Sequence, residues 1–371
     1  MRIVIDDKIP YVDGALEALR VKLAERGRTL EVVRKAGSEI GAADVADAEV
    51  LVVRTRTRCD GKLLSGSQVR LVVTATIGYD HIDTEFMRQA GIAWTNCPGC
   101  NATSVAQYVG ACLLLLQRER GLSLKDITLG IIGVGHVGTA VAATAQHLGI
   151  GRLLLNDPPR QAQEETARIG GETYKWSSLA EVLAESDVIT LHTPLTNEGL
   201  YPTLHLIDSE AIAQMRQRPV LINAARGGIV DETALESALD SGDVSAAIID
   251  TWEHEPDISP TLLAKAYLAT PHIAGYSADG KANATRMSME AVAQHLGLDM
   301  TFDVKAPTQT RSYATNAGEA DNRTLPTDTE ERALWLYDPR VDSRRLKASR
   351  TSFETLRGHY PLRREATESA Q

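Results

Sequence analysis

Three polar residues that each follow an apolar run could together oxidise a hydroxy acid. Arg226 comes after VLINAA, Glu255 after AAIIDTW and His272 after YLATP. Removing a hydride from a 2-hydroxy acid requires a cation for the carboxylate, a base for the hydroxyl proton and a group that tunes the base. Arginine binds a carboxylate through two parallel hydrogen bonds, histidine accepts a proton near neutral pH, and a neighbouring glutamate fixes its tautomer. The three residue types predict a 2-hydroxy acid dehydrogenase.

A glycine motif predicts the cofactor that would accept the hydride. Gly133, Gly135 and Gly138 form G-x-G-x-x-G between the strand-like run LGII and a helical run rich in Ala and Val. Such glycines allow a tight turn, a close approach of a pyrophosphate and close packing of helix on strand. His136 and Val137 would lie at the helix N-terminus, where free N–H groups face the phosphates. The motif therefore indicates a dinucleotide.

An acidic residue after the next apolar run indicates which dinucleotide binds. Asp157 ends RLLLND, where a carboxylate would accept hydrogen bonds from the adenine ribose hydroxyls. A 2'-phosphate at that place would meet a negative charge, so the prediction is NAD. Arg160 is the one nearby residue that leaves NADP as an alternative.

Each catalytic candidate also has an ordinary interpretation. Alone, Arg226 would be read as a surface ion-pair residue, Glu255 before a proline as a turn residue, and His272 as a structural histidine. Their joint position after strand-like runs, downstream of a dinucleotide motif, favours catalysis, because parallel sheets place their sites at the carboxyl ends of strands.

Two further patterns are less specific. Cys97 and Cys100 form CPGC, which has the spacing of a redox pair, but with only four cysteines in the chain a structural role is favoured. We expect no metal site. Arg54, Arg56 and Arg58 alternate, so an extended segment would place them on one face. That row could bind a substrate phosphate or form a solvated edge, and the sequence leaves both open.

Apolar runs alternating with helical patterns predict an α/β fold. We expect two Rossmann-like doubly wound parallel-sheet domains, one inserted in the other, and a small C-terminal α+β dimerisation module. The expected parts are a substrate-binding domain over 1–98, an NAD-binding domain over 99–276, a return to the first domain over 277–299, and a linker with the C-terminal module over 300–371. A helix from Asn101 to Glu119, with Asn101 as its N-cap, would join the domains.

Composition limits the partners and the compartment. The net charge of −10 argues against nucleic acid as a partner, and no apolar run is long enough for a membrane. The N-terminus does not resemble a signal peptide, so we expect a cytoplasmic protein.

These motifs resemble those of the D-isomer-specific 2-hydroxyacid dehydrogenases, which carry G-x-G-x-x-G followed by Arg, Glu and His in this order. TATIGYDHID, PGCNA, DPPR and PHIAGYS resemble the branch of the family that acts on a phosphorylated four-carbon 2-hydroxy acid. LYDPRVD and FETLRGHYPLRRE resemble the C-terminal dimerisation domain of that branch. The resemblance thus implies a phosphorylated 2-hydroxy acid as substrate and a homodimer.

The resemblance also implies roles for further residues. Substrate contacts are expected at Thr55, Thr76 and Tyr276. NAD contacts are expected at His136, Val137, Asp157, Thr193, Ala224, Ala225, Arg226, Asp250 and Gly275. Two alternatives remain open: a sister dehydrogenase acting on phosphoglycerate or glycerate, and an NADH-sensing, corepressor-like binding protein.

Overall fold

A computed structural model describes residues 1–309, 311–320 and 324–365 of the chain. The chain forms two compact units, each made of two stretches: Met1–Asn101 with Ser277–Thr308, and Ala102–Tyr276 with Gln309–Gln371. These boundaries near 101 and 276 lie close to the expected ones. The C-terminal end differs from the expectation: Gln309–Gln371 belongs to the second unit and does not form a unit of its own.

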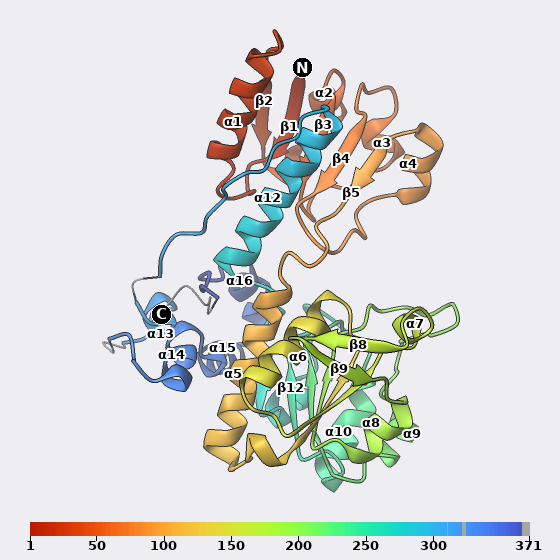
Figure 1. The fold of residues 1–371 in the computed structure, drawn as a ribbon, viewed down its shortest axis with the longest axis vertical. Helices are drawn as coiled ribbons and strands as arrows, with labels where there is room; N and C mark the ends of the chain where they lie inside the picture. The colour runs from red at the N-terminus through yellow and green to blue at the C-terminus, as the bar shows by residue number, and fades with distance from the viewer. Residues whose placement is uncertain (310, 321–323, 366–371) are drawn as a thin grey trace. The chain divides into compact units, whose positions relative to one another are not determined.

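The first unit is a parallel sheet of five strands in the order β2-β1-β3-β4-β5. Its strands are β1 (Arg2–Asp6), β2 (Glu31–Lys35), β3 (Val50–Val53), β4 (Leu71–Thr74) and β5 (Ala93–Thr95). Its helices are α1 (Asp13–Ala24), α2 (Ala42–Val45), α3 (Gly61–Leu64), α4 (Thr84–Ala90) and α12 (Ala278–His295), with the 3-10 turn η1 (Gly37–Glu39). The late helix α12 packs against α1 and β4, so it returns to the unit that the chain left at residue 101 (Figure 1).

The second unit has a parallel six-stranded sheet in the order β13-β12-β11-β10-β6-β7. Its strands are β6 (Thr128–Ile132), β7 (Arg152–Asn156), β10 (Val188–Leu191), β11 (Val220–Asn223), β12 (Ala246–Ile249) and β13 (Leu268–Ala269). The helices within its first stretch are α5 (Ala102–Arg120), α6 (His136–His147), α7 (Pro158–Gln161), α8 (Leu179–Glu185), α9 (Ser209–Ala213), α10 (Glu232–Ser241) and α11 (Pro260–Lys265). The 3-10 turn η2 (Leu124–Asp126) lies between α5 and β6. The strands appear in the sequence as continuous apolar runs because both faces of the sheet are covered.

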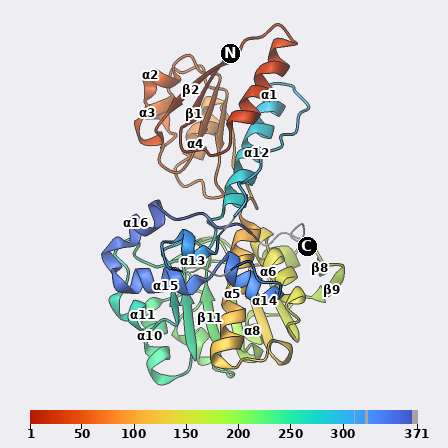
Figure 2. The ribbon, with the colours of Figure 1, turned by 90° about the vertical axis from the view of Figure 1, so that its left-hand side faces the viewer.

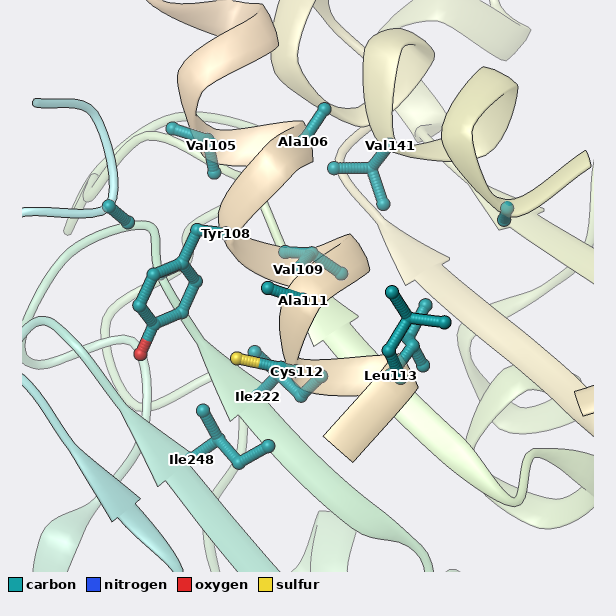
Figure 3. Close-up of a cluster of buried hydrophobic side chains, with 14 of the residues drawn as sticks. Val105, Ala106, Tyr108, Val109, Ala111, Cys112, Leu113, Val141, Ile222 and Ile248 are labelled. Carbon is teal, nitrogen blue, oxygen red and sulfur yellow. The ribbon is translucent and has the colours of Figure 1, made fainter. Parts of the chain in front are cut away.

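The long helix α5 provides one side of the core of the second unit. Tyr108 and Cys112 of α5 face Ile222 of β11 and Ile248 of β12, and Val141 of α6 lies nearby (Figure 3). All five side chains are almost fully buried. The helix expected from Asn101 to Glu119 therefore forms, with bounds shifted by one residue. No helix among the described residues is long and apolar enough to span a bilayer.

The C-terminal stretch differs from the separate α+β module that we expected. Its described residues form α13 (Tyr313–Asn316), α14 (Thr329–Leu336), α15 (Pro339–Ala348), η3 (Arg350–Ser352) and α16 (Phe353–Gly358), and none of them is in a strand. α14 and α15 contact α5, and α15 also contacts β13 (Figure 2). Tyr313, Tyr337 and Tyr360 join the same core as α5. The stretch covers an apolar face of the second unit because its own short helices could not bury a core by themselves. Part of the expected linker, residues 310 and 321–323, lies outside the described residues.

Other differences are local. The hairpin β8 (Thr166–Ile169) with β9 (Glu172–Lys175) was not predicted, because its strands are short and only partly apolar. Asn101 was expected to cap α5, but its side-chain oxygen is buried and has no hydrogen-bond partner among the described residues. That interpretation of Asn101 is wrong.

Candidate active site

The three catalytic candidates follow three neighbouring strands of one sheet. Arg226 comes after β11, Glu255 after β12 and His272 after β13, and these strands are adjacent and parallel. Because parallel strands end at the same edge, all three residues belong to the carboxyl edge of the second unit's sheet. Gly133 after β6 and Thr193 after β10 belong to this edge too.

His272 and Glu255 form a hydrogen-bonded pair. Nδ1 of His272 lies 2.8 Å from one carboxylate oxygen of Glu255 and 3.0 Å from the other. An ionised carboxylate only accepts hydrogen bonds, so Nδ1 carries the proton and the neutral ring leaves Nε2 free of one. This is the tautomer that a proton-accepting histidine requires.

Glu255 is held in its ionised form. Burial works against ionisation, but the hydrogen bond from His272, the N–H of Trp252 at 3.0 Å and the charge of Arg357 help to outweigh burial. The pKa of the Glu255 carboxyl is consequently below its ordinary value. Glu255 therefore remains a hydrogen-bond acceptor for His272 throughout the neutral range.

Arg226 presents an exposed side chain at the end of β11. Only its Nη1 has an internal contact among the described residues, to the carbonyl oxygen of Ala225 at 2.7 Å. The side chain of Asn223 donates to the carbonyl oxygen of Arg226 at 3.1 Å, which fixes the backbone behind it. A guanidinium with most of its N–H donors facing outward is suited to a carboxylate.

The backbone after His272 is held by a buried carboxylate. Asp250 accepts hydrogen bonds from the hydroxyl of Thr270 at 2.6 Å and from the N–H groups of Ile273 at 2.8 Å and Ala274 at 2.9 Å. His272 has a φ of +56°, a left-handed conformation that is unfavourable for a non-glycine residue. Asp250, expected to contact NAD, thus makes its observed contacts to the loop that carries His272 and Gly275.

The glycine motif forms a backbone cradle that fits a dinucleotide. Gly133 has a φ of +86°, and a Cβ there would lie 2.7 Å from the backbone N of Thr193. A Cβ on Gly138 would overlap the carbonyl oxygen of Gly133, whereas the space next to Gly135 is open. Gly135 also caps α6 without a side chain, so the first N–H groups of α6, from His136 and Val137 on, remain available to phosphate.

Thr193 gives a second sign of a ligand at this edge. Its hydroxyl oxygen is buried and has no hydrogen-bond partner among the described residues. A buried hydroxyl is normally satisfied, so the orphaned group fits a bound cofactor. Ala224 and Ala225, at the end of the adjacent strand β11, are nearly buried and add an apolar surface there.

The residues around Asp157 favour NAD. Asp157 accepts hydrogen bonds from the N–H of Val134 at 2.8 Å and of Arg160 at 3.0 Å, so it ties the glycine turn to α7. Arg160 is already engaged: its guanidinium donates to the Val134 carbonyl, pairs with Glu164 at 2.7 Å and lies over the Trp176 ring. A side chain held in this way is a poor receptor for the 2'-phosphate of NADP.

Asp157→Ala is expected to weaken NADH binding about tenfold, which corresponds to ~1.4 kcal/mol. The variant loses the carboxylate that orders the Val134 turn and would meet the ribose. Fluorescence titration with NADH measures the dissociation constant. Asp187→Ala is the matched control, because Asp187 also accepts a backbone N–H, that of Thr128, but before β10, at the opposite edge of the sheet. Equal affinity in wild type and Asp157→Ala would contradict the assignment.

The expected substrate residues fall in both units. Thr55 follows β3 and is exposed, and Thr76 follows the neighbouring strand β4, so both belong to the carboxyl edge of the first unit's sheet. The Thr76 hydroxyl contacts Thr74 at 2.7 Å and the Gly78 carbonyl at 2.8 Å. Tyr276 belongs to the second unit, at the end of the His272 loop.

The alternating arginines near Thr55 do not form a row. β3 ends at Val53 and the chain turns immediately afterwards, so the extended segment that the alternation required is absent. Arg58 pairs with Asp60 at 3.2 Å, and Arg54 contacts the Lys8 carbonyl oxygen at 3.4 Å.

Sequence reasoning missed the arginines that the C-terminal stretch brings to this edge. Nη1 of Arg357 in α16 lies 3.7 Å from a carboxylate oxygen of Glu255. Burial lowers the pKa of Arg357, but the charges of Tyr276 and Glu255 and a hydrogen bond with Tyr276 raise it overall. The only signal was the run of arginines in LRGHYPLRRE, which does not reveal where they pack.

The cysteines do not form a redox pair. None of the four is in a disulfide and all are buried, and the thiol of Cys97 contacts the carbonyl oxygens of Thr74 and Ala284 and the hydroxyl of Ser288. These contacts agree with the structural role favoured for CPGC. In the described residues, no cluster of three or more His, Cys, Asp or Glu side chains could hold a metal ion.

Comparisons with known proteins show which family and which enzymes the chain is similar to. Residues 112–274 match the profile described as D-isomer specific 2-hydroxyacid dehydrogenase, NAD binding domain. The chain is 46% identical to an erythronate-4-phosphate dehydrogenase of Bacteroides fragilis over 98% of this chain and 97% of that protein. It is 46% identical to the enzyme of the same name from Bacteroides thetaiotaomicron, with the same coverage. A solved D-lactate dehydrogenase of Aquifex aeolicus, complexed with NAD and lactic acid, is 25% identical with a TM-score of 0.58, and covers 83% of this chain and all of that one.

Proposed function

Because this chain belongs to the D-isomer-specific 2-hydroxyacid dehydrogenase family, we propose that it oxidises 4-phospho-D-erythronate to 2-oxo-3-hydroxy-4-phosphobutanoate. The chain is an NAD-dependent enzyme, and the reaction is a step in the synthesis of pyridoxal 5'-phosphate. The observation that carries the assignment is the identity of 46% to erythronate-4-phosphate dehydrogenases over 98% of the chain. The match to the D-lactate dehydrogenase covers only 83% of this chain.

The residues of the second unit support a direct mechanism. Arg226 binds the substrate carboxylate through its outward N–H donors and orients C2. Nε2 of His272 takes the proton of the 2-hydroxyl group while the C2–H bond breaks and its electron pair leaves as hydride, so that C2–O becomes a carbonyl. NAD, when bound, supplies the hydride acceptor. Glu255 keeps Nδ1 protonated and stabilises the imidazolium that forms, at the 2.8 Å contact.

Substrate profiling tests the assignment. Purified enzyme with NAD is expected to show a kcat/KM for 4-phospho-D-erythronate at least about tenfold above that for 3-phosphoglycerate or D-glycerate, since a site built for one phosphorylated acid discriminates by its polar contacts. NADH formation at 340 nm measures the rates. A preference for 3-phosphoglycerate would contradict the substrate, and NADH binding without turnover of any of the three acids would indicate a corepressor-like protein instead.

We also propose that the enzyme is a cytoplasmic homodimer. The resemblance of the C-terminal stretch to a dimerisation domain supports this state. Deleting everything after about Asp299 would be a poor test, because Tyr313, Tyr337 and Tyr360 belong to the core of the second unit. Light scattering of the full chain is the appropriate measurement, and the mass of a single chain would contradict the proposal.

A further inference from the structure

We infer that Arg363 is a positioning residue for the reaction, holding the backbone loop that carries His272 in its active conformation. The inference rests on the proposed function of His272. Arg363 lies in the C-terminal stretch, far along the sequence from residues 272–276, yet the two segments are in direct contact within the second unit.

The guanidinium of Arg363 is fully buried and makes three of its hydrogen bonds to carbonyl oxygens of the loop. Nη1 donates to Ile273 at 3.1 Å and to Tyr276 at 2.7 Å, and Nη2 donates to Ala274 at 2.6 Å. Nη2 also donates to the Ser104 carbonyl at 3.1 Å, Nε donates to the Gln107 side chain at 2.9 Å, and Nη1 also contacts the Tyr360 hydroxyl at 2.8 Å. Half of these six contacts are thus to the loop.

The loop is therefore held from both sides by opposite charges. The carboxylate of Asp250 accepts hydrogen bonds from the N–H groups of Ile273 and Ala274, and the guanidinium of Arg363 donates hydrogen bonds to the carbonyl groups of the same two residues. His272, with its φ of +56°, is the residue directly before them. A left-handed histidine persists only where its surroundings impose the conformation, and these two side chains impose it.

The chemical surroundings of Arg363 indicate that packing alone does not explain why its guanidinium is buried. Its guanidinium lies 3.9 Å from the centre of the Tyr337 ring, and it makes no ion pair with an acid among the described residues. The nearby Asp342 instead accepts hydrogen bonds from Tyr313 at 2.8 Å and 3.0 Å. A buried cation is costly unless polar groups replace its water, and here backbone carbonyls, most of them next to His272, do so.

Arg363→Lys provides the test, because lysine keeps the charge but not the planar fork. We expect kcat with 4-phospho-D-erythronate to fall about 100-fold, the effect of an ångström-scale misplacement of a reacting group. The NADH dissociation constant should change far less than kcat, because Gly275 is the only residue of the loop that is expected to contact NAD and the glycine cradle does not involve Arg363. Hydrogen exchange of the peptide spanning 268–276 should become faster.

Arg340→Lys is the matched control. Arg340 lies in α15 of the same stretch and pairs with Asp338 at 2.7 Å and Glu119 at 2.7 Å. Among the described residues, Arg340 makes no hydrogen bond or ion pair with the His272 loop. A general loosening of the stretch would therefore affect both variants alike, whereas the loss of a positioning role affects only Arg363→Lys. Equal losses of kcat in the two variants, or wild-type kcat and loop exchange in Arg363→Lys, would overturn the inference.

A milder variant tests the positioning role of Arg363 if Arg363→Lys does not fold. Gln107→Met removes the acceptor for Nε of Arg363 and retains the charge and the carbonyl contacts. A smaller loss of kcat with faster loop exchange is expected, and wild-type values of both would refute the positioning role. If wild type does not oxidise 4-phospho-D-erythronate, the proposed substrate is wrong, but loop exchange in Arg363→Lys against Arg340→Lys still tests whether Arg363 holds the loop.

Discussion

His272→Asn is expected to lower kcat by about 10²- to 10⁴-fold, the usual contribution of a positioned general base. Asparagine tolerates a left-handed backbone better than other non-glycine residues, so the φ of +56° at this position need not change. The variant removes the nitrogen that would accept the hydroxyl proton and the partner of Glu255. Steady-state kinetics with 4-phospho-D-erythronate and NAD measures the effect, and NADH affinity should remain close to that of wild type.

The second unit offers a close control for this variant. His205 also has a positive φ, of +49°, and it too contacts a glutamate, because its Nε2 lies 2.9 Å from Glu253 whereas Nδ1 of His272 contacts Glu255. His205→Asn should therefore leave kcat within about twofold of wild type, if a general base is what the first variant lost. A small effect of His272→Asn, or similar effects of both variants, would remove His272 from the role of base.

Arg226→Lys is expected to lower kcat/KM for the hydroxy acid by about 10- to 100-fold. Lysine retains the charge but cannot make two parallel hydrogen bonds to the carboxylate, and one charge-assisted hydrogen bond is worth about 1.5–3 kcal/mol. Initial rates at saturating NAD with varied 4-phospho-D-erythronate measure the change.

Arg152→Lys serves as the control for Arg226→Lys. Arg152 begins β7, at the amino end of the sheet, and pairs with Glu185 at 2.7 Å on the surface. Its substitution should not change kcat/KM, because exposed ion pairs contribute little and this one is remote from the carboxyl edge. Near-normal kinetics of Arg226→Lys would exclude Arg226 from carboxylate binding.

The sequence was informative wherever a local pattern carries the physical signal. The buried strands β6, β7, β11 and β12 were predicted because strands covered on both faces are continuous apolar runs. The glycine motif and Asp157 were found because a backbone cradle needs glycine at fixed spacing. The candidates after β11, β12 and β13 followed from the rule that sites gather at the carboxyl ends of parallel strands.

The sequence was uninformative where a contact joins distant segments. Arg363 and Arg364 are chemically identical neighbours, yet one is fully buried against the His272 loop and the other is partly exposed. Nothing local distinguishes them, because burial of an arginine depends on acceptors supplied by Ile273 and Ala274. The packing of the C-terminal stretch was missed for the same reason.

The order of the two units along the chain has a consequence for biosynthesis. The second unit begins at Ala102, but its core includes Tyr313, Tyr337 and Tyr360, which are translated after the first unit has received its last segment. A nascent chain that stops near residue 300 already contains every strand of both sheets, and still exposes the apolar face that these tyrosines cover. The first unit can therefore mature while the ribosome is still translating, whereas the second waits for the late helices and depends on protection from aggregation until they arrive.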